Sequence, residues 1–166
     1  NINRTNENGY ILAMLTILSI FGTRPKAIKM APVIKELEKY SHKIRSLVCI
    51  TAQHRQMLDQ LPDLFNIIPN YDLDIMQENQ TLSQLTARAL AAIDTLLKEV
   101  KPDCILVQGD TITTMVASLA GFYRRIKIGH KEKMVSPILS MVSPRTPYVN
   151  YVGIWDRFRF FLTEDA

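Results

Sequence analysis

The feature that most constrains the fold is an apolar run that meets a helical pattern at a single glycine. The run at 11–21 ends at Gly22, and helical periodicity begins at Arg24. Glycine adopts backbone angles that are closed to other residues. Thr23 is a favourable N-cap, and Pro25 is tolerated in a first helical turn. This order of residues predicts a β-strand, a tight turn and the N-terminus of a helix.

The same turn is a candidate anion site. The N–H groups at the start of a helix, together with the helix dipole, attract negative charge. Arg24 and Lys29 add two positive charges beside that point. The alternative is an ordinary strand-to-helix turn with solvated charges, and one glycine turn does not separate the two.

The composition is typical of one globular domain. The chain has 166 residues, 47% hydrophobic and 22% charged, which is enough for one proper core but cramped for two domains. The net charge of +4 is dispersed, so we expect no nucleic-acid partner. The run at 11–21 is too short to cross a bilayer, so we expect no membrane span.

Cys49 and Cys104 lie inside apolar runs. We expect both to be buried and reduced, which fits a cytoplasmic protein better than a secreted one. No metal-ligand spacing involves them, and the sequence predicts no metal site.

Short apolar runs alternate with segments of helical periodicity along the chain. Strands that are buried on both faces of a parallel sheet have this pattern. We therefore expect an α/β fold, a Rossmann-like parallel sheet with helices on both faces, and a half-exposed strand at 71–75. The apolar runs are 17–21, 47–51, 104–107 and 126–129, and the helical segments are 27–37, 82–100 and 113–123.

Polar side chains follow three of these strands. Arg24, Asp110 and the pair His130 and Glu132 stand where successive strands end. Parallel strands bring these ends to one edge of the sheet, where open α/β sheets bind ligands. Asp110 can act as an acid–base group there, or it can simply cap the following helix.

The polar segment 51–56 follows the strand at 47–51 and includes Gln53 and Gln56. By its position it is a candidate ligand contact. A capped helix start with an exposed face explains the same residues equally simply.

Several motifs, in one order and at nearly the same spacing, resemble the non-hydrolysing bacterial UDP-N-acetylglucosamine 2-epimerases. They are F-G-T-R-P-K-A-I-K-M-A-P-V-I, T-A-Q-H-R-Q-M-L-D-Q, Y-D-L-D-I-M, G-D-T-x-T-T and I-G-H-x-E. The resemblance covers Leu15 to Glu132. It implies that the chain forms the first of two Rossmann-like domains, which is the N-terminal half of a fold of the GT-B type. In this fold the two domains close on a UDP-sugar.

The resemblance also implies a reaction. In the family a base removes the proton at C2 of the sugar while the C1–O bond to UDP breaks. UDP then adds again and the proton returns from the other face, which converts UDP-N-acetylglucosamine to UDP-N-acetylmannosamine. No redox cofactor is needed, and the family is homodimeric.

Residue by residue, the resemblance implies catalytic roles for Asp110 and Glu132. It implies substrate binding by Arg24 and Lys29, which match the basic pair of the first motif. Acid–base groups on opposite faces of the sugar, and positive charge at the departing diphosphate, are what such a reaction requires.

Gln53 and Gln56 match family positions with a different role. In several members these positions contact a second, regulatory UDP-N-acetylglucosamine between the two domains. The resemblance therefore implies an allosteric site there, which is not universal in the family.

Three residues inside the motifs depart from the family. It has Glu where Lys26 stands, Thr where Ile112 stands, and commonly His where Gln108 stands.

The departure is larger after His130. The family continues V-E-A-G-L-R-T and then supplies another catalytic carboxylate, which has no counterpart here. The match resumes faintly at 160–164, so we interpret the intervening text as a shifted reading frame, later restored, or a sequence error. We expect a polar, disordered lead-in at 1–14, a Rossmann-like domain at 15–130 and a divergent tail at 131–166.

Two functions follow from these observations. One is the N-terminal part of an epimerase, inactive alone because half of the cleft is missing. The other is a non-catalytic relic, or a domain that only binds a nucleotide-sugar.

Overall fold

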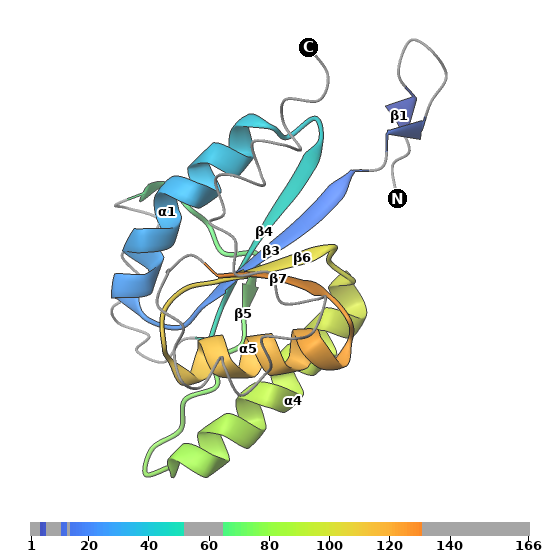
Figure 1. Ribbon diagram of the computed structural model, residues 1–166. Coiled ribbons are helices and arrows are strands. Elements are labelled where there is room, and N and C mark those ends of the chain that lie inside the picture. The colour runs from blue at the N-terminus through green and yellow to red at the C-terminus, as the bar shows by residue number, and fades with distance from the viewer. Residues whose placement is uncertain (1–3, 6–10, 13, 52–64, 131–166) are drawn as a thin grey trace.

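Parallel strands form the centre of this computed structural model, which describes residues 4–5, 11–12, 14–51 and 65–130. The strands are β3 (Leu15–Phe21), β4 (Ile44–Ile50), β5 (Tyr71–Asp72), β6 (Cys104–Val107) and β7 (Lys127–His130). They form one five-stranded sheet in the order β5-β4-β3-β6-β7, and every neighbouring pair is parallel (Figure 1). The predicted Rossmann-like sheet is confirmed.

β3 lies in the middle of the sheet. Leu18 is in register with Leu47 of β4 on one side and with Ile105 of β6 on the other. Leu18 and Ile105 have no exposed surface, as expected for strands that are covered on both faces. Parallel pairing brings the carboxyl ends of these strands to one edge, which is where the polar motifs stand.

The strand predicted at 71–75 is shorter than expected. β5 ends at Asp72 because Asp72 Oδ1 accepts a hydrogen bond of 3.1 Å from the backbone N–H of Asp74. Asp74 itself has a φ of 41°, in the left-handed region. Such a turn, closed by an aspartate side chain, competes with the strand.

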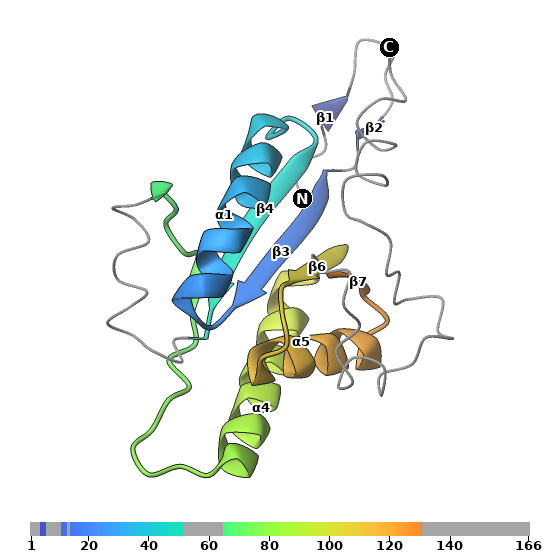
Figure 2. The same ribbon diagram turned by 60° about the vertical axis from the view of Figure 1, so that its left-hand side comes forward.

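Helices cover both faces of the sheet, as predicted. The helix α1 (Arg24–Lys39) lies on one face, and α4 (Leu82–Val100) and α5 (Ile112–Tyr123) lie on the other (Figure 2). The helical periodicity of 27–37 predicts an apolar face formed by Ala27, Met30, Ala31, Ile34 and Leu37. All five are buried in α1, and Val33 is buried with them.

α5 approaches the sheet closely at Gly121. A Cβ on this residue would lie 2.8 Å from Cδ1 of Ile105. The glycine therefore lets the last turn of α5 pack directly on β6.

Little of the predicted lead-in at 1–14 belongs to the described residues. In the lead-in, β1 (Arg4–Thr5) pairs antiparallel with β2 (Ile11–Leu12), and the disorder expected at 1–14 stays a prediction. The tail at 131–166 lies outside the described residues. Within the described ranges, no helix has the length and apolar character needed to cross a membrane.

Candidate functional site

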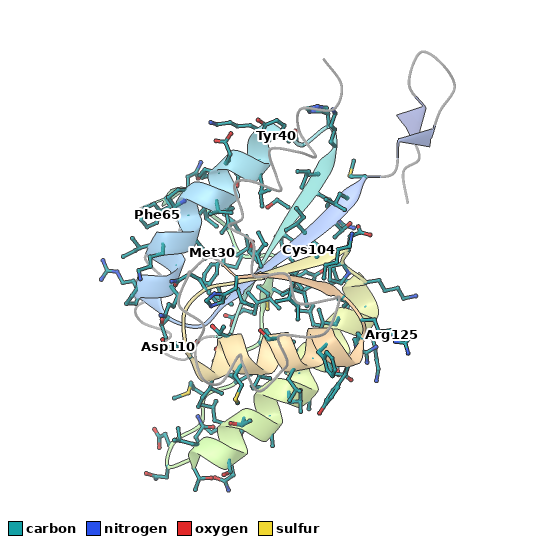
Figure 3. All side chains as sticks on the ribbon, viewed as in Figure 1. Met30, Tyr40, Phe65, Cys104, Asp110 and Arg125 are labelled. Carbon is teal, nitrogen blue, oxygen red and sulfur yellow. The ribbon has the colours of Figure 1, made fainter. Side chains whose placement is uncertain are left out.

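The site lies at the carboxyl edge of the sheet, between the start of α1 and the loop from β6 to α5. Arg24 is the first residue of α1, which follows β3, and Asp110 follows β6. Figure 3 shows Asp110 near the N-terminal ends of α1 and α5. The predicted placement of these two residues on one edge is confirmed.

The N-terminus of α1 has no side-chain cap. Thr23 occupies the N-cap position with extended backbone, but its side chain makes no capping hydrogen bond. Thr23 is therefore the N-cap, as predicted, but its side chain leaves the first backbone N–H groups without a capping acceptor. The first turn also contains no acidic residue. No carboxylate in the first turn therefore balances the partial positive charge at the N-terminus of α1. Such a helix end favours an anionic ligand.

Arg24 is half-buried at this point. Its Nε is buried and has no hydrogen-bond partner among the described residues. A buried donor without a partner is costly, and a phosphate oxygen is a natural acceptor for a guanidinium group. Arg24 is therefore arranged as an anion-binding side chain.

The loop from β6 to α5 depends on Gly109. Its φ of 83° is a conformation that favours glycine. The ammonium group of Lys26 also occupies the place where a Cβ on residue 109 would lie. The backbone angle thus favours glycine, and a side chain at residue 109 would move the end of the Lys26 side chain from its present place.

Two hydrogen bonds hold this loop from neighbouring elements. Nε2 of His130, at the end of β7, lies 2.9 Å from the carbonyl oxygen of Gly109. The hydroxyl of Thr114 donates to the carbonyl oxygen of Gln108 at 2.9 Å. The backbone beside Asp110 is therefore fixed by β7 and by α5.

Asp110 does not cap α5. Thr111 is the N-cap, and its side chain accepts a hydrogen bond from the backbone N–H of Thr114. The helix begins at Ile112, one residue before the predicted start. The interpretation of Asp110 as a simple capping residue is wrong, and its carboxylate is available for another role.

The Asp110 carboxylate pairs with a cation from α1. Nζ of Lys26 lies 3.2 Å from Oδ1 of Asp110. The Lys26 hydrogen bond is the main reason that the pKa of Asp110 lies below its ordinary value; a hydrogen bond to its own backbone and the charges of Lys26 and Lys29 act in the same direction. Asp110 is therefore ionised at neutral pH.

Sequence reasoning missed one buried contact beneath this edge. The hydroxyls of Thr51 and Thr113 lie 2.8 Å apart, and neither residue is exposed. This contact joins the end of β4 to the first turn of α5. The available signal was that both threonines stand beside strand or helix ends, inside polar motifs.

The two cysteines are free thiols, as predicted; Cys49 is buried as expected, whereas Cys104 is only partly buried. Burial is the main cause that raises the pKa of Cys49 to about 12 and that of Cys104 to about 11. Both are therefore protonated and unreactive at neutral pH. In the described part of the chain, no three His, Cys, Asp or Glu side chains are grouped so that they could hold a metal ion.

Comparison with known proteins identifies the family. The family model for UDP-N-acetylglucosamine 2-epimerase matches residues 35–132. The chain belongs to the UDP-N-acetylglucosamine 2-epimerase family. The resemblance seen in the motifs is thereby confirmed.

Relatives within this epimerase family are similar over most of the chain. The UDP-N-acetylglucosamine 2-epimerase of Bacillus subtilis is 56% identical over 118 residues, which are 71% of this chain and 31% of the relative. That of Neisseria meningitidis is 47% identical over 154 residues, 92% of this chain and 41% of the relative, so this match extends past His130. The chain thus spans about a third to two fifths of these relatives.

A solved structure of the same family agrees with the fold. The crystal structure of UDP-GlcNAc 2-epimerase from Neisseria meningitidis bound to UDP-GlcNAc has a TM-score of 0.71 at 46% identity. It covers 78% of this chain and 38% of the other. The architecture of an N-terminal part of this epimerase fold is therefore shown.

Three of the predicted site residues lie outside the described residues. Gln53 and Gln56 fall within 52–64, and Glu132 within 131–166. All three lie within the span of the epimerase family match, which ends at residue 132. Their roles stay predictions.

Proposed function

We propose that this chain supplies the N-terminal half of the active site of an enzyme that interconverts UDP-N-acetylglucosamine and UDP-N-acetylmannosamine. The observation that carries the proposal is the ionised carboxylate of Asp110, held beside the cationic start of α1. A carboxylate and an anion-binding helix end are the two elements that deprotonation at C2 and departure of a diphosphate require.

The proposed chemistry is an elimination followed by a re-addition. A carboxylate accepts the proton at C2, the C2–H electron pair forms the C1–C2 double bond, and the C1–O bond breaks to release UDP. Asp110 and Glu132 are the acid–base groups, and Arg24 and Lys29 contact the diphosphate. The return step delivers a proton to the opposite face of C2. Because no electrons leave the substrate, no redox cofactor takes part.

The proposed ligand is supported by the relatives. The similar structure from Neisseria meningitidis is described as bound to UDP-GlcNAc. Arg24 offers a buried Nε without a partner among the described residues, and the first turn of α1 has no acidic residue. We further propose that Gln53 and Gln56 contact a second, regulatory UDP-N-acetylglucosamine.

These 166 residues alone are not expected to turn over the substrate. The chain spans 31% of the Bacillus relative, and the second Rossmann-like domain of the fold is expected to close the cleft. We propose that the protein is cytoplasmic, in keeping with its two free thiols. A domain that binds a nucleotide-sugar without catalysis is the second candidate, because the further catalytic carboxylate that the family has after the Glu132 position has no counterpart in this sequence.

Binding of UDP to the chain tests the first part of the proposal, which is that this edge of the sheet holds the diphosphate. UDP is titrated into the 15N-labelled chain while backbone amide shifts are recorded. The largest shifts are expected at the start of α1 and at the loop from β6 to α5. Arg24→Gln is expected to weaken binding about tenfold or more, as for loss of a charge-assisted hydrogen bond.

Lys39→Gln is the matched control for this titration. Lys39 also lies on α1, but in its last turn, and its loss is expected to leave UDP binding unchanged. Equal affinities for the unmodified chain and Arg24→Gln, or shifts confined to other edges of the sheet, would contradict the proposed site.

A further inference from the structure

We infer that Lys26 is a positioning residue that holds the Asp110 carboxylate at the N-terminus of α1. The two residues are 84 positions apart in the sequence, and Nζ of Lys26 lies 3.2 Å from Oδ1 of Asp110. The inference rests on the acid–base role proposed for Asp110. It adds a residue that acts on Asp110 rather than on the substrate.

The two partners are exposed to very different extents. The Lys26 side chain is 15% exposed, whereas that of Asp110 is 76% exposed. Surface ion pairs contribute little when two mobile side chains must both be ordered. Because the Lys26 side chain is largely covered, it has less freedom to lose than a fully exposed lysine when the pair forms.

Gly109 provides the path by which Lys26 reaches Asp110. The Lys26 ammonium lies where any Cβ on residue 109 would be, and the end of the lysine stem, Cε and Cδ, also lies close to that point. A side chain at position 109 would therefore displace Lys26. The absence of a side chain at residue 109 and the lysine at residue 26 are complementary features of one contact.

The backbone of the loop is fixed by other contacts. His130 contacts the carbonyl oxygen of Gly109, and Thr114 donates to that of Gln108. These contacts place the Cα of Asp110 but leave its side chain free to rotate. Lys26 restricts this rotation, because its ion pair selects the orientation in which the Asp110 carboxylate points toward α1.

Among the described residues, few charged groups lie around this carboxylate. Lys26 and Lys29 face it from α1, and His130 lies behind the loop on β7. α5 contains no charged residue. Lys26 lowers the pKa of Asp110 more than Lys29 does. The pair therefore stabilises the anionic form of Asp110, which is already the dominant form at neutral pH, and it fixes where that charge lies.

A carboxylate titration of the whole, ligand-free chain tests the inference. The pKa of Asp110 is measured by 13C NMR of its side-chain carboxyl group in the unmodified chain, Lys26→Gln and Lys26→Glu. We expect the lowest pKa in the unmodified chain, a higher one in Lys26→Gln and the highest in Lys26→Glu, where two carboxylates meet.

The control variant is Lys39→Gln, which removes the same charge from the same helix. Lys39 also pairs with a glutamate, Glu36, at 2.7 Å. It lies about 20 Å along the helix from Lys26, beyond a Debye length of about 10 Å at moderate salt. The Asp110 pKa is therefore expected to stay at its unmodified value. Circular dichroism confirms that each variant is folded before it is titrated.

Three results would overturn the inference. They are an ordinary aspartate pKa for Asp110 in the unmodified chain, an unchanged pKa in folded Lys26→Gln, or an equal rise in Lys39→Gln. The first needs no variant, so the test does not depend on the stability of any mutant. No nucleotide is present, so failure to bind UDP would contradict the proposed function and leave this result intact.

Discussion

The hydroxyl oxygens of Thr51 and Thr113 lie 2.8 Å apart in the interior, between the end of β4 and the first turn of α5. Both residues are fully buried. A buried hydroxyl must find a partner inside the protein. The pair therefore connects one strand end to the helix whose start carries the Asp110 loop.

Thr51→Val is expected to lower the free energy of unfolding by about 1–3 kcal/mol, because it leaves the Thr113 hydroxyl buried without this partner. Urea denaturation monitored by circular dichroism measures the change. The double variant Thr51→Val, Thr113→Val should cost less than the sum of the two single variants. Additive losses would show that the two hydroxyls do not interact.

The start of α4 allows a matched test of capping. Thr81 accepts a hydrogen bond from the backbone N–H of Gln84, and the Gln84 side chain accepts one from the backbone N–H of Thr81. Thr81→Ala is expected to lower the free energy of unfolding by about 1 kcal/mol.

Thr95→Ala makes the same replacement inside the same helix. Thr95 is exposed, and its hydroxyl bonds only back to the carbonyl oxygen of Ala91. Alanine has the higher helix propensity, so this variant is expected to be neutral or slightly more stable. Equal losses for Thr81→Ala and Thr95→Ala in urea denaturation would contradict the capping account.

Asp94 is expected to make stability depend on pH. The Arg124 hydrogen bond at 2.6 Å is the main cause of its lowered pKa, and Lys98 contributes to a smaller extent. An aspartate with a lowered folded-state pKa stabilises the protein above its unfolded pKa, ordinarily about 3.9. This contribution is lost as pH falls through the folded-state value.

Asp94→Asn should therefore be less stable than the unmodified chain at neutral pH, and the difference should disappear in acid. Urea denaturation at a series of pH values measures it. A difference that stays constant down to the acid limit would show that Asp94 does not stabilise through its charge.

The sheet and its helices could be predicted because their signals are local. The run at 104–107 contains only buried or half-buried apolar residues and coincides with β6. Thr81 precedes a long amphipathic pattern and caps α4. The end of β5 was missed because the turn depends on the side chain of Asp72, which also suits an alternating strand.

The contacts inside the site could not be predicted, because they join distant parts of the chain. Lys26 was recognised only as a departure from the family, since nothing near it in the sequence indicates Asp110. Similarly, Thr23 has the right residue type and position for an N-cap, yet its side chain makes no capping bond. Position along a strand edge follows from the sequence, whereas side-chain partners across that edge depend on the tertiary structure.

We propose that this chain provides the half of the epimerase active site that contains Asp110. The most direct measurement is proton NMR of UDP-N-acetylglucosamine in D2O with a chimera, in which residues 15–130 replace the matching segment of the Bacillus subtilis relative. We predict formation of UDP-N-acetylmannosamine with deuterium at C2, a rate about 10²–10⁴ times lower for the Asp110→Asn chimera, and no conversion by the 166-residue chain alone. Full activity of the Asp110→Asn chimera, or turnover by the isolated chain, would contradict the account.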